Sequence, residues 1–241
     1  MSEAAGAGAL FLIPTLLGES GVDEVLPEAV KAKIQEMDAF VAESAKSARH
    51  FLRAAGYPRP LTDVVIRELN EHTPAAALEE LLAPIDAGMR VGMLSEAGCP
   101  AVADPGAALI ALAHARGLRV VPLVGPSALL LALMASGLNG QRFCFHGYLP
   151  VDRAERDDAI RQLETASRRG RQTQMFIEAP YRNVRMFDAL LRVCHPATRL
   201  CLATHLTLAD ESVRTCTIAQ WRGVPVPQLD RRPTVFLLLA Y

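Results

Sequence analysis

The segment 93–128 constrains the fold most, because it repeats a pattern of strand, loop with Gly and Pro, and helix. The apolar run at 91–94 predicts a strand, and a turn at 104–106 precedes an amphipathic helix. A second strand is predicted at 118–124, and it ends at Gly125-Pro126. Strands that alternate with helices are typical of parallel sheets, which bind ligands in the loops after the carboxyl ends of their strands. We therefore expect a small-molecule site in these loops.

The same alternation continues on both sides of this segment. Further strands are predicted at 9–13, 39–42, 61–69, 143–146, 173–177, 200–204, 212–218 and 234–240. Helices are predicted at 27–37, 44–52, 73–87, 127–136, 153–168 and 181–193. The segment 147–150 interrupts the pattern as a linker does. We therefore predict an α/β fold of two α/β domains, residues 1–147 with the ligand loops and residues 148–241.

The composition is that of a globular protein large enough for one or two cores, with 241 residues, 51% hydrophobic residues and a net charge of -1. Its five cysteines include no C-x-x-C pair and lie mostly in apolar stretches, as reduced cytoplasmic thiols do. The Ala/Gly-rich first nine residues lack the basic segment of a secretory signal, and prolines interrupt the most apolar stretch. We expect a cytoplasmic protein without disulfides, export signal or membrane span.

Common catalytic and nucleotide-binding motifs are absent from the sequence. It contains no G-x-G-x-x-G after a strand, no G-x-x-x-x-G-K-[ST], no H-E-x-x-H and no G-x-S-x-G. The six histidines lack metal-ligand spacing, so no metal is expected. Loops of glycine, proline and backbone amides suit a neutral or zwitterionic ligand. Asp104 and Pro105 also have a structural interpretation, as the N-cap and first residue of the next helix.

The same loops resemble the motifs of the tetrapyrrole-methylase superfamily. S-E-A-G-C-P-x-x-x-D-P-G at 95–106, V-P-L-V-G-P-S-A at 121–128 and R-F-C-F-H-G-Y-L-P at 142–150 are similar to its S-D-A-G-T-P-x-x-x-D-P-G, V-P-x-P-G-P-S-A and R-F-x-F-x-G-F-L-P. Their order and spacing best match its branch of bacterial 16S ribosomal RNA cytidine 2′-O-methyltransferases. L-I-P-T at 12–15 and F-I-E-A-P-Y-R at 176–182 extend the resemblance over nearly the whole chain.

This resemblance implies a homodimeric methyltransferase that binds S-adenosylmethionine in the cleft between its two α/β domains. Carried over position by position, it places the following residues at the cofactor: Pro14, Ala97, Gly98, Cys99, Val102, Ser127, Ala128, Glu178 and Leu206. Most of these residues lie in the loops that the strand pattern had already marked.

The segments on the acceptor side depart further from the family. A-E-S-A-K at 42–46 stands where the ribosomal RNA enzymes have A-E-D-T-R, and T-H-L-T at 204–207 replaces their R-E-L-T. We interpret Glu43 and Lys46 as candidate catalytic residues that orient or deprotonate an acceptor hydroxyl. The structural alternative is that Glu43 caps the following helix or stabilises its dipole.

The leading hypothesis for function is 2′-O-methylation of ribosomal RNA in the small subunit. Two alternatives stay open, namely methylation of a tetrapyrrole or another small molecule, and cofactor binding without catalysis. The second half of the chain carries an excess of basic residues, much of it in the arginine-rich segment 153–171. This segment either contacts RNA phosphates or forms a solvated helix face.

Overall fold

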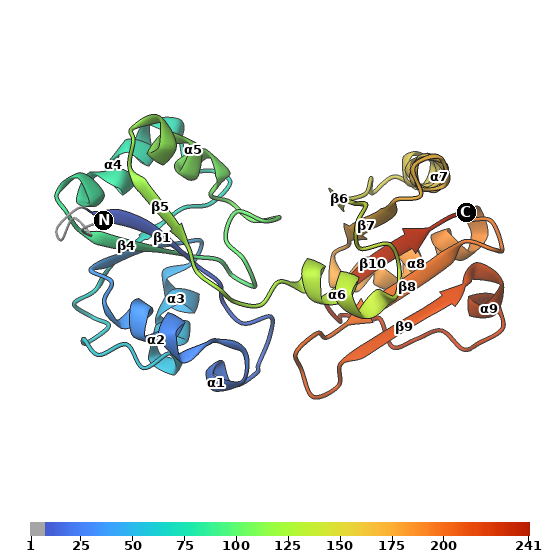
Figure 1. The fold of residues 1–241 in the computed structure, drawn as a ribbon, viewed down its shortest axis with the longest axis horizontal. Coiled ribbons are helices and arrows are strands. Elements are labelled where there is room, and N and C mark those ends of the chain that lie inside the picture. The colour runs from blue at the N-terminus through green and yellow to red at the C-terminus, as the bar shows by residue number, and fades with distance from the viewer. Residues whose placement is uncertain (1–7) are drawn as a thin grey trace. The chain divides into compact units, whose positions relative to one another are not determined.

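Two five-stranded sheets organise the protein, in a computed structural model that describes residues 8–241 (Figure 1). The chain divides between Ser127 and Ala128 into two units, each with its own sheet. This boundary lies earlier than the predicted one after residue 147. The reason is that the strand at 143–148 pairs with the second sheet, although sequence pattern alone had placed it at the end of the first domain.

The first unit is a parallel sheet with the strand order β3-β2-β4-β1-β5. Its elements are β1 (Ala9–Ile13), α1 (Val22–Val25), α2 (Glu28–Gln35), β2 (Ala39–Ala42), α3 (Ala45–Ala54), β3 (Val65–Glu68), α4 (Ala75–Asp86), β4 (Arg90–Leu94), α5 (Ala107–Ala115) and β5 (Arg119–Pro122). Because all five strands are parallel, the loops after their carboxyl ends lie at one edge of the sheet.

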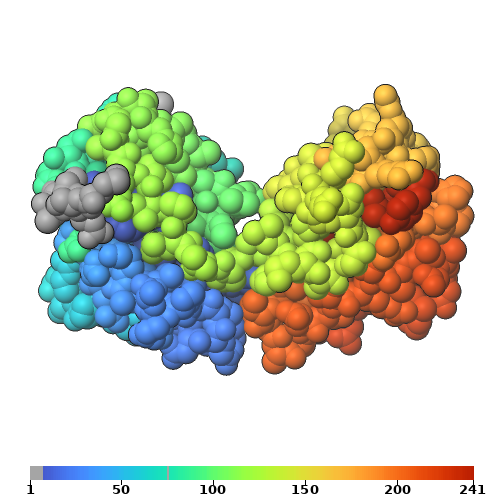
Figure 2. All heavy atoms as spheres, in the orientation of Figure 1, coloured from blue at the N-terminus to red at the C-terminus, as the bar shows by residue number. Residues whose placement is uncertain are grey.

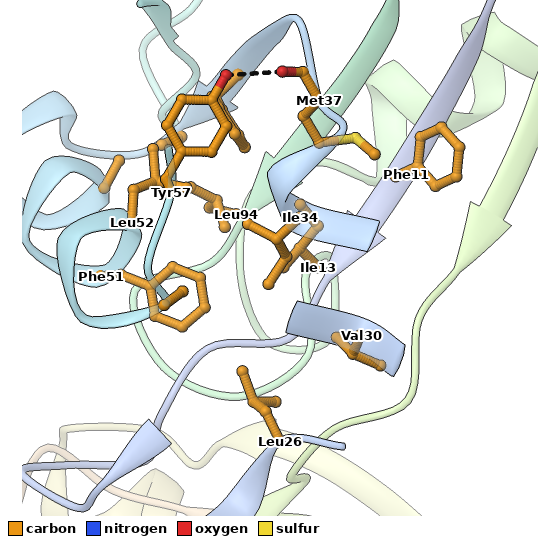
Figure 3. Packing of buried hydrophobic residues seen from close by; sticks show 14 of the residues in the cluster. Phe11, Ile13, Leu26, Val30, Ile34, Met37, Phe51, Leu52, Tyr57 and Leu94 are labelled. Carbon is orange, nitrogen blue, oxygen red and sulfur yellow. Dashed lines mark hydrogen bonds between the residues drawn. The ribbon is translucent and has the colours of Figure 1, made fainter. Parts of the chain in front are cut away.

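Alternating side chains of β1 build cores on both faces of this sheet. On one face, Phe11 and Ile13 belong to the same buried cluster as Ile34 of α2 and Phe51 of α3 (Figure 3). On the other face, Leu10 joins the helices α4 and α5. Each such aliphatic or aromatic side chain contributes about 1.5–3 kcal/mol on burial. Helices on both faces therefore fix β1 in the interior of the sheet, as Figure 1 shows.

The second unit is a mixed sheet with the strand order β6-β7-β10-β8-β9, in which only β6 and β7 are parallel. Its elements are α6 (Ala128–Ser136), β6 (Phe143–Tyr148), α7 (Arg153–Gly170), β7 (Thr173–Ile177), the 3-10 helix η1 (Pro180–Arg182), α8 (Asn183–Val193), β8 (Arg199–Thr204), β9 (Ser212–Thr217), α9 (Ile218–Arg222) and β10 (Thr234–Leu239). Figure 2 shows the surface of both units in the same colours.

The main core of the second unit lies between its sheet and the helices α7, α8 and α9. Phe236 of β10 stacks on Phe176 of β7 with 5.4 Å between ring centroids, and Phe187 of α8 packs edge-on against Trp221 of α9. The indole Nε1 of Trp221 donates to the carbonyl of Leu200 at 2.9 Å, which satisfies its one buried donor. This network anchors the short helix α9 to β8.

The predicted α/β class is confirmed, and the differences lie at element ends. Thr73 does not cap α4: its hydroxyl accepts from the backbone N–H of Asn70, and Pro74 occupies the N-cap position.

All five cysteines are free thiols. Within residues 8–241, no helix is both long and apolar enough to cross a bilayer. In this same range, no group of three or more His, Cys, Asp or Glu side chains is arranged to hold a metal ion.

Candidate functional site

Three loops meet at the carboxyl edge of the first sheet, because β1 lies between β4 and β5. The backbone N–H of Thr15, after β1, donates to the carbonyl of Gly98, after β4, at 2.9 Å. The Cys99 thiol lies 3.5 Å from the carbonyl oxygen of Pro126, after β5. Burial raises the pKa of this thiol, and its hydrogen bond with Ser127 opposes that shift. The loops after β1, β4 and β5 thus form one connected rim, which we call the three-loop rim (residues 14–20, 95–106 and 123–127).

Close backbone packing shapes the three-loop rim. A Cβ atom on Gly125 would lie 2.5 Å from Cβ of Pro14, and Gly98 has a φ of 75° that favours glycine. Ala101 and Ala103 also have positive φ values, of 62° and 63°. Left-handed backbone at non-glycine residues costs of order 1–3 kcal/mol each, and it concentrates at functional sites. The loop after β4 is therefore held in a conformation that its local sequence disfavours.

The structure brings together most of the residues assigned to the cofactor by resemblance. Seven of them lie on the three-loop rim or directly after it: Pro14, Ala97, Gly98, Cys99, Val102, Ser127 and Ala128. Among these, Ala97 and Val102 are exposed, while Pro14 and Gly98 are buried. The rim therefore offers a mixture of solvent-facing side chains and tightly held backbone. Binding of a ligand by these residues stays a prediction.

Glu178 and Leu206 lie in the second unit. The buried carboxylate of Glu178 pairs with the Arg182 guanidinium at 2.7 Å and accepts from the backbone N–H of Ala179 at 2.7 Å. These contacts stabilise the turn after β7. The Glu178 carboxylate therefore already has partners within the protein. Leu206 is buried in the loop after β8, between His205 and Thr207, which both have positive φ values.

Carboxyl groups gather at the ends of β2 and β4. Glu43 and Asp104 line a cavity of about 10 Å³, roughly the size of one water molecule. Burial, together with the smaller effects of the Glu43 and Glu96 charges, raises the pKa of Asp104 to about 6. Burial also raises the pKa of Glu43, followed by the charges of Glu96 and Glu71. Asp104 Oδ2 is buried without a hydrogen-bond partner among residues 8–241.

Neither Asp104 nor Glu43 caps a helix, so both capping interpretations are wrong, while stabilisation of the α3 dipole by Glu43 stays a prediction. Gly106, with a φ of 133°, occupies the N-cap position of α5 and makes no side-chain hydrogen bond there. Ser44 caps α3, since its hydroxyl accepts from the backbone N–H of Ser47 at 3.3 Å. The carboxyl groups of Asp104 and Glu43 are thus available for another role. Sequence analysis did not select Asp104 as a functional candidate. Its position in a predicted ligand-binding loop was the signal that could have identified it.

Replacing Asp104 by asparagine is expected to stabilise the protein at neutral pH. The folded state raises the pKa of this carboxyl above its ordinary 3.8, so ionisation costs stability as the pH rises from about 4 to 6. Asp104→Asn removes that cost and should raise the free energy of unfolding at pH 8 by about 1–2 kcal/mol, a value reduced for partial exposure to solvent. Urea denaturation at pH 8 and pH 4 should show a difference at pH 8 that shrinks at pH 4. An exposed control, Asp188→Asn, should show neither effect. Destabilisation of Asp104→Asn at pH 8 would contradict the prediction and show that the ionised carboxylate stabilises the folded state.

A larger cavity of about 970 Å³ lies beside the three-loop rim, between the loops after β1 and β4 and the helix α3. Lys46 and His50, one turn apart on α3, line it together with Glu96 and Thr15. Lys46 is exposed and, within the described residues, forms no ion pair with Glu43. The two predicted catalytic residues therefore line different cavities, Glu43 with Asp104 and Lys46 with His50. This space is wide enough for a ligand of nucleotide size.

Comparison with known proteins shows consistent relatives. No family model matches the chain. It is 30% identical over 222 residues to ribosomal RNA small subunit methyltransferase I of Escherichia coli O157:H7, covering 92% of this chain and 71% of that protein. It is 31% identical over 232 residues to the protein of the same name from Xylella fastidiosa, covering 96% of this chain and 81% of that protein.

Solved structures show the same fold at lower sequence identity. The methyltransferase CobJ matches with a TM-score of 0.63 and 19% identity, over 98% of this chain and 95% of CobJ. A conserved hypothetical protein from Aeropyrum pernix K1 matches with a TM-score of 0.65 and 16% identity, over 97% of this chain and 85% of that one. At these identities the likeness concerns the fold.

Two linked α/β units with a loop rim at the edge of a parallel sheet have the tetrapyrrole-methylase-like fold. The relatives in sequence show that the chain is a methyltransferase. The chain belongs to the ribosomal RNA small subunit methyltransferase I family. The predicted superfamily, fold class and enzyme class are thereby confirmed.

Proposed function

We propose that the protein transfers a methyl group from S-adenosylmethionine to a ribose 2′-hydroxyl of small-subunit ribosomal RNA. The observation that carries this proposal is the three-loop rim, joined by the contacts from Thr15 to Gly98 and from Cys99 to Pro126, in a chain of this family. As a ribosome-modifying enzyme it would act in the cytoplasm, and we propose a homodimer as its working form. Both of these points follow from the family resemblance.

The three-loop rim fits a zwitterionic cofactor better than a polyphosphate. It offers backbone amides and carbonyls together with the Ser127 hydroxyl and the Cys99 thiol, and no Lys or Arg lies in it. We assign Pro14, Ala97 to Cys99, Val102, Ser127 and Ala128 to cofactor binding, with Leu206 and the backbone at Glu178 as further contacts. Bound there, S-adenosylmethionine supplies an electrophilic methyl group, which needs little beyond alignment with its acceptor.

The acidic cavity supplies the group that removes the acceptor's proton. A carboxylate whose pKa is raised toward neutrality is a stronger base than an exposed one, and burial raises the pKa of both Glu43 and Asp104. We propose that Glu43 accepts the hydroxyl proton and that Asp104 shares it through the water-sized cavity between them. Lys46, on the cavity beside the three-loop rim, orients the acceptor through its phosphate or hydroxyl oxygens.

Two measurements on the purified protein test this function. Calorimetry is expected to show one site per chain for S-adenosylmethionine or its demethylated product. Labelled cofactor is expected to transfer its methyl group to small ribosomal subunits from a strain that lacks the family's methyltransferase, but not to a porphyrinoid extract. Label in the extract alone would establish a small-molecule acceptor. Cofactor binding with no label in either would indicate a non-catalytic binding protein.

Cys99→Thr is expected to preserve cofactor binding. A threonine hydroxyl can donate to the Pro126 carbonyl as the thiol does, and it is the stronger donor. The affinity for S-adenosylmethionine should stay the same or increase by at most about 1 kcal/mol. Calorimetry on both forms measures this directly. A loss of affinity beyond tenfold would separate the loop after β4 from the cofactor site.

A further inference from the structure

A second cavity, of about 380 Å³, lies entirely within the second unit. The antiparallel pair of β8 and β9 forms one wall, where Leu202 lies opposite Arg214 and Thr204 lies opposite Ser212. Trp221 of α9 contributes to the apolar floor, and the segment 225–232 closes the other side. We call this space the β8–β9 cavity. It shares no lining residue with the three-loop rim.

Positive charge dominates the β8–β9 cavity. The guanidinium of Arg214 lies 4.9 Å from the centre of the Trp221 ring, and no carboxylate within the described chain pairs with it. Arg232 pairs with Asp210 at 2.8 Å, but Asp210 also holds His205 at 2.8 Å. One carboxylate thus contacts both Arg232 and His205, while the Arg214 guanidinium keeps its full charge beside an open cavity. Such a site attracts an anion and repels a cation.

The loops beside this cavity are held in strained backbone conformations. His205 and Thr207, in the loop after β8, have φ values of 51° and 70°, and Arg231, next to Arg232, has a φ of 54°. A hydrogen bond from the backbone N–H of His205 to the carbonyl of Pro233 joins the two loops. The hydroxyl of Thr207 is buried without a partner among residues 8–241. Strain and an unsatisfied hydroxyl in adjoining loops are typical of a site shaped for binding.

We infer that the β8–β9 cavity binds a phosphodiester group of the RNA acceptor. Arginine recognises phosphate through two parallel N–H···O bonds, and the Trp221 ring holds the Arg214 guanidinium in place for this contact. Ser212 adds an exposed hydroxyl, and the proline residues of the segment 225–228 add apolar surface for the neighbouring ribose or base. The inference rests on the proposed function, since it takes RNA as the acceptor.

Trp221 makes the test direct, because it is the only tryptophan in the chain. Occupation of the Arg214 guanidinium is expected to change the fluorescence of the indole on which it lies. A 16S ribosomal RNA transcript should produce this change at micromolar or lower concentration, and inorganic phosphate should produce it only at much higher concentration. A change with phosphate and none with RNA would overturn the inference, since the cavity would then hold a free anion.

Arg214→Gln tests the same contact through RNA affinity. Filter binding at several salt concentrations should show about 5–10-fold weaker binding at low salt, and a salt dependence reduced by about one phosphate contact. Arg214→Lys keeps the charge but loses the paired N–H geometry. Its RNA affinity should lie between that of Arg214→Gln and that of the unaltered protein. The control Arg119→Gln removes one exposed charge at the amino-terminal end of β5, in the first unit, and should bind RNA as the unaltered protein does. Circular dichroism verifies that each variant is folded.

The remaining outcomes separate this inference from the proposed function. Unchanged RNA affinity and salt dependence in Arg214→Gln would overturn the inference, even if methyl transfer to ribosomal subunits is observed. Weaker S-adenosylmethionine binding in the same variant, with unchanged RNA binding, would also overturn it and assign the cavity to the cofactor. RNA binding that depends on Arg214 without any methyl transfer would support the cavity assignment and contradict the catalytic proposal.

Discussion

Glu43→Gln is expected to slow methyl transfer by about 10²–10⁴-fold, the usual contribution of a general base. Glutamine keeps the size and hydrogen-bonding capacity of the side chain but cannot accept the proton of the acceptor hydroxyl. Glu43 caps no helix and interacts unfavourably with Glu96 and Asp104, so the free energy of unfolding should stay the same or rise slightly. Initial rates with saturating cofactor and RNA, together with urea denaturation, measure both effects.

Ser44→Ala is the matched control for this experiment. Ser44 is the residue that caps α3, so its loss should lower the free energy of unfolding by about 1 kcal/mol. The rate of methyl transfer per folded molecule should change little. The reverse pattern, with a destabilised Glu43→Gln and a stable Ser44→Ala, would show that Glu43 supports the helix and would remove it from the catalytic assignment.

Gly125→Ala is expected to weaken cofactor binding by about 10–100-fold, because small displacements of binding groups carry large costs. The added Cβ would lie 2.5 Å from Cβ of Pro14 and 3.1 Å from Leu26 Cδ2, so the loops after β1 and β5 must separate. Overpacking of this kind also lowers stability, by about 1–3 kcal/mol. Calorimetry well below the unfolding temperature isolates the effect on binding.

Gly140→Ala serves as its control, because a Cβ atom there meets nothing within 4 Å. This variant should bind S-adenosylmethionine as the unaltered protein does. Equal affinities for Gly125→Ala, Gly140→Ala and the unaltered protein would contradict the assignment of the three-loop rim to the cofactor. A selective loss in Gly125→Ala would link the contact between Pro14 and Gly125 to binding.

Short-range sequence signals sufficed for most of the secondary structure. Each strand of the first sheet follows from an apolar run closed by Gly, Pro or a polar turn, and these signals act over a few residues. The carboxyl-edge position of the ligand loops also followed, because parallel strands place their ends together. The domain boundary could not be predicted from such signals. The apolar pattern of 143–148 specifies a strand without specifying its partner strand. Pairing with β7 decides which unit holds this strand.

The sequence by itself determined the alternation of strands and helices, the loops after β1, β4 and β5 and, through resemblance, the family. Only the tertiary structure decided what Asp104, Glu43 and Arg214 face. Asp104-Pro105 has the local signature of a helix start, but the pKa of Asp104 depends on burial and on carboxylates from distant parts of the chain. The charge of Arg214 likewise acquires its setting from Trp221 and Arg232. Local preferences act between residues that are neighbours in the sequence, whereas burial and electrostatics act between residues that are close only in space. The two proposed sites depend on burial and electrostatics.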